Sequence, residues 1–245
     1  MKVIPLSEGT FTIDKTKQFV PFDTDKDDLQ QRPVGSLLVE IQPFVVITSE
    51  DVLLLDTGLG FAGENGRLQL HQNLMDNGIN PGEVTKVLMT HLHKDHAGGV
   101  ATGTGSARTL SFPQARYYIQ KQEMDYVYEK GFPSYIPEEL DCLKDAPQVE
   151  WLHGDGVIDG YIKHEITGAH SKYHQAFWIV DGGETVFFGG DDAPQLQQMR
   201  SRFVAKYDYD GKKSMELRQQ WWKKGEEERW KFLFYHDVKN PIWEF

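Results

Sequence analysis

The sequence predicts an α/β fold in which two sheets pack together with helices outside. Apolar runs of strand length recur in both halves of the chain, and each half also carries apolar residues at helical spacing. No internal repeat of about 20 to 50 residues is evident. With 245 residues, of which 39% are hydrophobic, the chain can bury a sizeable core, and we expect a single domain over residues 1–245.

Strands dominate the prediction for the first half. Apolar, β-branched runs predict three strands, at Leu37–Ile41, Phe44–Ile47 and Val52–Leu55. Leu68, Leu74 and Met75 then recur at helical spacing before Asn77-Gly78, which predicts a helix with His71 on its face. Before these elements, residues 11–22 carry scattered aromatic side chains, which could cover a pocket, support a dimer contact or pack in the core.

The second half repeats strands and helices. We expect strands at 115–119, Val149–Leu152, 161–166, 175–180, 185–188 and 232–235. Helices are expected over 120–130 and from Ser214 onward, the latter carrying Leu217, Trp221 and Trp222.

Charge and cysteine content restrict the function. The net charge of −11 argues against a nucleic-acid-binding surface, which usually needs a basic patch. Cys142 is the sole cysteine, so no internal disulfide forms, which suits a reducing cytosol. Neither an export signal nor an apolar run of membrane-spanning length is present, so we expect a cytoplasmic protein without a membrane partner.

The most informative stretch follows the apolar run at 87–89. It places His91, His93, Asp95 and His96 within six residues. In an extended segment His91, His93 and Asp95 point to one side, and a turn near Asp95 would aim His96 at a neighbouring position. One ion could then take His91 and His93, and a second ion Asp95 and His96, so we predict a metal site.

The run His91-Leu92-His93-Lys94-Asp95-His96 resembles the H-x-H-x-D-H signature of the metallo-β-lactamase superfamily. Four more landmarks of that family stand in the right order: Asp56-Thr57-Gly58, Ala169-His170, Gly190-Asp191 and Tyr235-His236-Asp237. The resemblance spans roughly residues 35 to 240. It implies an αββα sandwich, two mixed sheets face to face with helices outside, and metals at the edge between the sheets.

The resemblance also implies a ligand set. It assigns His91, His93 and His170 to one metal, Asp95, His96 and His236 to a second metal, and Asp191 to both. Imidazole and carboxylate suit zinc, with manganese or iron as alternatives. Asp56 and His174 are expected to support the ligands rather than bind metal, and loss of such support typically costs about 10–100-fold in affinity or activity.

The implied activity is that of a dinuclear-metal-dependent hydrolase, in which a hydroxide shared by the metals attacks a lactone or ester carbonyl. Within the superfamily the sequence is most similar to N-acyl homoserine lactonases, notably at residues 115–121 and 206–210. The expected partner is a small-molecule ester or lactone, and the expected state a monomer or homodimer.

Two departures from the lactonase pattern leave the chemistry open. The third motif reads Ala169-His170-Ser171-Lys172-Tyr173-His174 in place of G-H-T-P-G-H, and Pro194 stands where those lactonases carry a catalytic Tyr. We therefore predict that Tyr173 or Asp192 acts in its place, beside Asp95 and Asp191.

Two alternatives to the lactonase interpretation follow from the same residues. One is a phosphotriesterase-like or thioesterase member of the superfamily, because a dinuclear site can also attack phosphorus or a thioester. The other is a non-catalytic, metal-binding regulatory protein on this fold, which the missing Tyr at Pro194 favours and the complete ligand set opposes.

Overall fold

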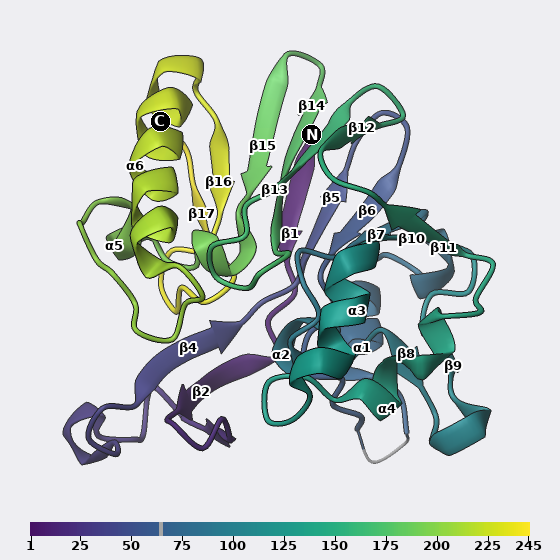
Figure 1. Cartoon of the computed structure of the whole chain (residues 1–245), viewed down its shortest axis with the longest axis horizontal. Helices are drawn as coiled ribbons and strands as arrows, with labels where there is room; N and C mark the ends of the chain where they lie inside the picture. Colours follow the sequence, from purple (N-terminus) through teal and green to yellow (C-terminus); the bar gives the residue numbers. More distant parts are fainter. Residues whose placement is uncertain (64–65) are drawn as a thin grey trace.

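Two six-stranded sheets face each other in the computed structural model, which describes residues 1–63 and 66–245 (Figure 1). The first sheet has the order β1 (Lys2–Pro5), β5 (Phe44–Ile47), β6 (Val52–Leu55), β7 (Lys86–Leu88), β10 (Arg116–Gln120) and β11 (Val149–Leu152). The second has the order β12 (Gly156–Ile158), β13 (Ile162–Ile166), β14 (Gln175–Asp181), β15 (Glu184–Phe188), β16 (Lys231–Leu233) and β17 (Ile242–Trp243).

Both sheets are mixed. In the first, β1, β5 and β6 pair antiparallel, whereas β6, β7, β10 and β11 pair parallel. In the second, the β15–β16 pair is parallel and the other pairs are antiparallel. The parallel pairs matter for the site, because loops that follow neighbouring parallel strands meet at one edge of a sheet.

Smaller elements complete the chain. Two minor sheets are formed by β3 (Phe19–Pro21), β2 (Gly9–Ile13) and β4 (Leu37–Ile41), and by β8 (Ala101–Thr102) and β9 (Thr109–Leu110). The α-helices are α1 (Gln69–Asp76), α2 (Lys94–Ala97), α3 (Lys121–Lys130), α4 (Pro137–Leu140), α5 (Leu196–Met199) and α6 (Gly211–Glu228). The 3-10 helices are η1 (Leu29–Gln31), η2 (Pro81–Glu83), η3 (Gly105–Ala107), η4 (Asp141–Leu143) and η5 (Gly190–Asp192).

Strand β6 shows why the sheets stack. Leu53 and Leu55 pack between the two sheets with Phe188 of β15, whereas Leu54 points to the opposite face, where it packs with Leu70 of α1. Side chains alternate along a strand, so a continuous apolar run indicates burial on both faces. This strand therefore belongs to a layer covered from both sides.

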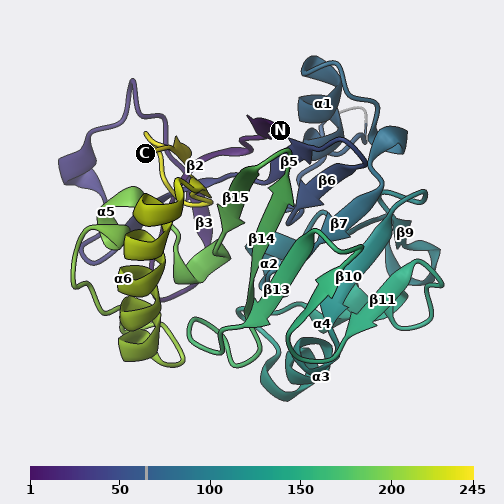
Figure 2. The ribbon, with the colours of Figure 1, turned by 90° about the horizontal axis from the view of Figure 1, so that it is seen from above.

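The outer faces carry the helices. Helices α1 and α3 cover the first sheet, and α6 covers the second, where Trp221 packs against Phe187 and Trp178 (Figures 1 and 2). The order of layers is thus helix, sheet, sheet, helix, and the predicted αββα sandwich is confirmed.

The element bounds mostly agree with prediction. The strands expected at Leu37–Ile41, Phe44–Ile47 and Val52–Leu55 have these bounds. The last long helix begins at Gly211 rather than Ser214, because the Asp210 side chain accepts a hydrogen bond from the Lys213 amide and caps an earlier turn. None of the helices among the described residues is long and apolar enough to cross a membrane.

Candidate metal centre

The histidine-rich stretch follows the carboxyl end of β7, and residues 89–93 connect that strand to α2. The His96 and Ala97 amides both donate to the His93 carbonyl at 2.9 Å. The turn therefore begins at Lys94, one residue before the predicted position, and it carries Asp95 and His96 toward the same region as His91 and His93.

The other predicted ligands arrive from the second sheet. His170 lies in the loop between β13 and β14, Asp191 in η5 directly after β15, and His236 three residues beyond β16. Because β15 and β16 are parallel neighbours, Asp191 and His236 emerge at the same sheet edge.

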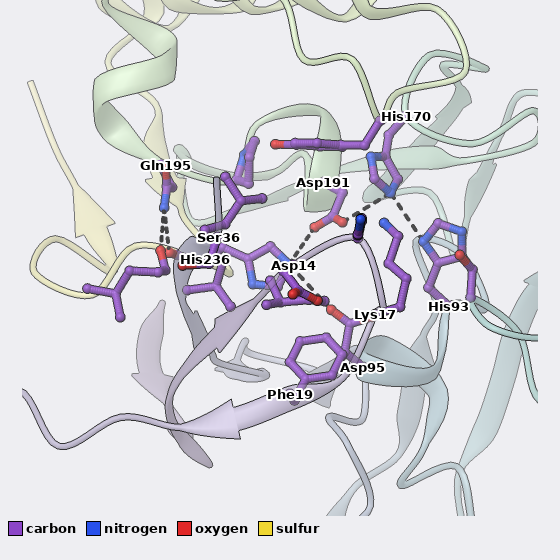
Figure 3. Close-up of a pocket in the computed structure, with 18 of the residues that line it drawn as sticks. Asp14, Lys17, Phe19, Ser36, His93, Asp95, His170, Asp191, Gln195 and His236 are labelled. Carbon is purple, nitrogen blue, oxygen red and sulfur yellow. Dashed lines mark hydrogen bonds and ion pairs between the residues drawn. The ribbon is translucent and has the colours of Figure 1, made fainter. Parts of the chain in front are cut away.

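The six other candidate ligands converge around Asp191, and Figure 3 shows His93, Asp95, His170 and His236 among them. Asp191 Oδ2 lies 3.1 Å from His170 Nε2, and Asp191 Oδ1 lies 3.0 Å from His236 Nε2 and 3.1 Å from His96 Nε2. His93 Nδ1 is 3.2 Å from His170 Nε2. A carboxylate between two sets of imidazoles is the arrangement that a shared ligand of two cations requires.

Two ligand groups can be distinguished. His91, His93, His170 and Asp191 form one, and Asp95, His96 and His236 the other; within each group the candidate ligand atoms lie within 4.8 Å of one another. This grouping matches the division of ligands that the family resemblance implies.

In four of the histidines, Nδ1 points away from the ligand cluster (the outward nitrogen) and lies beside a polar neighbour. Nε2 points into the cluster (the inward nitrogen) and would be free to bind metal. His91 Nδ1 lies 3.0 Å from the Thr90 hydroxyl, and His236 Nδ1 lies 2.7 Å from the Glu40 carbonyl. His96 Nδ1 and His170 Nδ1 each face a carboxylate, as described below. Such partners orient an imidazole and fix its tautomer.

Orphaned polar atoms provide a test of fit. His96 Nε2 and Asp191 Oδ1 are both buried and lie within ion-pair distance of each other, yet within the described residues neither makes a hydrogen bond of acceptable geometry. Buried polar atoms are otherwise almost always paired, and each would be satisfied by a bound cation. The residues therefore fit a metal centre.

Electrostatics favour the ligand forms of several groups. Burial lowers the pKa of His91 and His93 well below the usual range, and charge on neighbouring histidines adds to this effect. Burial opposes ionisation of Asp191, but the positive charges of His236, His96 and His170 outweigh it and hold its pKa well below normal. Neutral imidazoles and an ionised carboxylate are the species that bind metal. Burial opposes protonation of His96, His170 and His236, but the negative charge of Asp191 outweighs it and raises their pKa, so a cation would bind here by displacing protons.

Asp56 ties two strand ends together beneath the ligands. Its side chain is fully buried. Oδ1 accepts a hydrogen bond from the Thr90 amide and Oδ2 accepts one from the Thr90 hydroxyl, each at 2.7 Å, and Oδ2 also lies 2.7 Å from His96 Nδ1. The loop after Asp56 also packs directly on the ligand loop, since a Cβ at Gly99 would lie 2.1 Å from the Thr57 carbonyl. This geometry agrees with a supporting role.

His174 and Asp192 lie behind Asp191, away from the cavity. His174 Nε2 accepts the Asp191 amide at 3.2 Å, and its Nδ1 lies 3.0 Å from Asp192 Oδ2. Asp192 Oδ1 accepts the His170 amide at 2.7 Å. Asp192 is fully buried, so it is placed to hold two ligand loops in register rather than to reach a substrate.

Tyr173 also lies outside the cavity. The Tyr173 ring packs edge-on against the Tyr126 ring, with 5.7 Å between the centroids, and Lys172 Nζ lies 5.2 Å from the centroid of the Tyr173 ring. The hypothesis that Tyr173 replaces the lactonase Tyr therefore gains no support from its position. Pro194 does line the cavity, without a hydroxyl to offer.

Two site residues were missed from the sequence. Asp208 Oδ1 lies 2.8 Å from His170 Nδ1, and Tyr207 lines the cavity with its ring 6.2 Å from the His170 ring. Burial, together with the negative charges of Asp208 and Asp191, raises the pKa of Tyr207 to about 12. The similarity of residues 206–210 to lactonases was the available signal, but it assigned no role.

A cavity of about 750 Å³ opens onto the ligand cluster. Its floor includes His93, Asp95, His170, Asp191 and His236, and its other walls come from residues 13–19, residues 32–39 and the segment from Pro194 to Gln198. The β2–β3–β4 sheet thus projects beside the metal centre and forms one side of the space above it (Figures 1 and 3). This volume is suited to a small-molecule substrate.

Curated relatives include N-acyl homoserine lactonases named AttM. The protein of Agrobacterium fabrum is 26% identical over 113 residues, which cover 42% of this chain and 38% of the relative. The protein of Rhizobium johnstonii is 27% identical over 113 residues, with the same coverage. The aligned part thus spans about two fifths of each relative's length.

Solved structures agree in fold over nearly the whole chain. A probable metal-dependent hydrolase from Staphylococcus aureus superposes with a TM-score of 0.79 and 20% identity, covering 99% of this chain and 91% of that one. AidC, a dizinc quorum-quenching lactonase in complex with a product, gives a TM-score of 0.73 and 19% identity, covering 98% and 88%.

The family profile that matches is that of the metallo-β-lactamase superfamily, over residues 39–220. This range contains Asp56, the histidine-rich stretch, His170 and Asp191, and it extends into α6. Because the match covers most of the sequence and the sandwich and ligand cluster agree with it, the chain belongs to the metallo-β-lactamase superfamily.

Proposed function

We propose that this protein is a dinuclear-metal-dependent hydrolase that opens lactones or cleaves esters of small molecules, with zinc as the expected metal. The observation that carries the proposal is the convergence of seven candidate metal ligands, five of which line the floor of a substrate-sized cavity. The lactonase relatives and the dizinc neighbour support it.

His91, His93 and His170 would hold one ion, Asp95, His96 and His236 the other, and Asp191 both. When bound, such ions lower the pKa of water toward about 7 and polarise a substrate carbonyl. The chain's own contribution is the fixed geometry: the partners on the outward nitrogens hold the imidazoles in place before substrate enters.

Asp95 is the candidate for proton transfer. Its Oδ2 lies 3.6 Å from His236 Nε2 and 3.8 Å from His96 Nε2, and the residue lines the cavity. Oδ2 faces the other two candidate ligands and would be the oxygen that binds metal, which leaves Oδ1 to accept a proton and return it to the leaving oxygen.

Tyr207 is our candidate for the hydroxyl that Pro194 cannot supply. It lies in the cavity wall beside His170, and its position allows the phenol to donate a hydrogen bond to substrate oxygen. A Tyr207→Phe variant that lowers kcat about 10-fold or more with intact metal content would support this role, and unchanged turnover would exclude it.

The proposal is tested with purified, zinc-loaded protein. Metal content should approach two equivalents, and turnover should be fastest on lactones of varied acyl length or on esters, compared with thioesters and aryl phosphotriesters. Chelation should abolish turnover and added zinc restore it. His236→Gln should lose metal and activity, whereas His153→Gln, which changes an exposed histidine away from the cavity, should behave as wild type.

The other outcomes separate the alternatives. Faster turnover of phosphotriesters or thioesters would show that one of these, rather than a lactone or ester, is the substrate class. Two bound equivalents of metal without hydrolysis of any substrate class would show that the protein is a metal-binding regulatory protein rather than an enzyme. The cytoplasmic location and the monomeric or homodimeric state stay predictions.

A further inference from the structure

Four cationic side chains, against three carboxylates, line the metal cavity of a protein that is strongly acidic overall. The chain has a net charge of −11, yet Lys15, Lys17, Arg32 and Lys94 all line this cavity. The lining acids are Asp14 and the two ligand carboxylates. A local charge opposite in sign to the whole protein concentrates ligands of complementary charge.

Lys94 stands inside the ligand motif, between His93 and Asp95. Its side chain is half-buried, and its ammonium group lies 5.7 Å from the Phe19 ring centroid and 5.8 Å from that of Phe132. Nζ donates a hydrogen bond to the Lys17 carbonyl, and within residues 1–63 and 66–245 it forms no salt bridge with an acid. Its positive charge is thus available to a ligand.

Lys17 also reaches the cavity, from the turn between β2 and β3, and its carbonyl is the one that Lys94 contacts. Its ammonium group lies 5.7 Å from the Tyr207 ring centroid, and its charge contributes to the low pKa of His93 (Figure 3). No salt bridge to Lys17 occurs in the described part of the chain. The nearby acid, Asp14, is occupied by the Thr16 amide and hydroxyl instead.

The backbone of Lys17 adds to this argument. Its φ of 58° lies in the left-handed region, which is less favourable for a residue with a side chain than for glycine. A turn that needs only this conformation is better served by Gly or Asn. The lysine therefore places a cation at the cavity at the expense of local stability.

We infer that the substrate of this site carries a second, oxyanionic group, a carboxylate or phosphate, which Lys17 and Lys94 bind while the scissile carbonyl lies at the ligand cluster. This inference rests on the proposed hydrolase function. The Phe19 ring, which lines the cavity beside Lys94, suits a short methylene spacer between the anion and the carbonyl. Two bound divalent ions would add positive charge that Asp95 and Asp191 offset only in part, which strengthens the preference.

The test compares esters with the same leaving group and acyl length. The probes are 4-nitrophenyl pentanoate, its carboxylate-bearing counterpart mono-4-nitrophenyl glutarate, and the 4-phosphonobutanoate ester, each corrected for spontaneous hydrolysis. We expect kcat/KM at low salt to favour an anionic ester by about 10-fold or more, chiefly through KM, and the advantage to shrink as salt rises. The anionic ester with the higher kcat/KM shows whether the site prefers a carboxylate or a phosphate group.

Variants assign the preference to the two lysines. Lys94→Met and Lys17→Met should each lower the ratio of anionic to neutral kcat/KM several-fold, and Lys94→Arg should retain most of it. Lys212→Met, at a highly exposed lysine of α6 that pairs with Glu216, is the matched control and should keep the wild-type ratio. Zinc content is measured for every variant, so that metal loss is not mistaken for lost selectivity.

A binding measurement makes the test independent of turnover. Calorimetric titration of zinc-loaded protein with glutarate and with pentanoate should give tighter binding of glutarate, and Lys94→Met should remove the difference. If neutral esters are hydrolysed as well as the anionic ones, the inference is wrong and the proposed function stands. If no ester or lactone is hydrolysed, the proposed function is wrong, and equal binding of the two acids overturns the inference as well.

Discussion

Asp208 offers the sharpest test of how the metal centre is held. Its Oδ1 lies 2.8 Å from His170 Nδ1, and its side chain is 2% exposed. In Asp208→Asn the amide oxygen can still accept this hydrogen bond, so the geometry survives while the negative charge is lost. We expect zinc affinity to fall about 10–100-fold, which corresponds to about 1.4 to 2.7 kcal/mol.

The measurement is competition for zinc against a chelator of known affinity, with thermal unfolding as a check on folding. Asp125→Asn provides the matched control, because this aspartate is exposed and pairs with Lys121. Zinc affinity of Asp208→Asn within threefold of wild type would show that the carboxylate does not tune His170, and the reasoning about outward nitrogens would fail.

Three further predictions concern stability. Burial raises the pKa of Glu8 to about 7, so the folded protein holds this proton more tightly than the unfolded chain, and stability falls as pH rises from about 4.5 to 7. Glu8→Gln should match wild type near pH 5 and exceed it by about 2 to 3 kcal/mol at pH 8 in urea denaturation; an equal difference at both pH values would contradict this. Gly225→Ala should destabilise the protein by about 1 to 3 kcal/mol despite better helix propensity, because the new Cβ would lie 2.3 Å from the Phe232 ring, and a higher Tm would refute the clash. Asp210→Ala should lower the free energy of unfolding by about 1 kcal/mol through loss of the α6 cap, whereas Asp210→Asn should retain most of it.

Local sequence was sufficient for the strands at the centre of the fold. Phe44–Ile47 and Val52–Leu55 are continuous apolar runs because both of their faces are covered, and their bounds were predicted correctly. The short edge strand β17 (Ile242–Trp243) was not predicted. It has two residues and pairs with β16, so tertiary contact rather than local preference defines it.

The metal centre likewise has one part that the sequence predicts and another that it does not. The spacing of His91, His93, Asp95 and His96 is a short-range signal, and the structure brings these residues together with the distant ligands as expected. The groups that orient them were mostly out of reach. The partner of His236 is the backbone carbonyl of Glu40, which lies 196 positions earlier in the chain. A backbone carbonyl is present at every residue, so the sequence gives no signal for this contact.

The cavity walls were the least predictable part, and they bear most directly on substrate choice. Residues 13–19 and 32–39 form one side of the space. The strand beginning at Leu37 was predicted, but the apolar residues of 13–19 show neither clear helical nor strand spacing. The β2–β3–β4 sheet that shapes them is held by pairing between segments far apart in the chain, Ile13 with Leu37 for example. In the hydrolase that we propose, the ligand cluster would determine the kind of bond that is attacked, whereas this sheet and Lys94 would determine which substrates reach it. Two superfamily members with the same seven ligands can therefore differ in substrate, because the charge and shape above the metals come from segments that the motifs do not include.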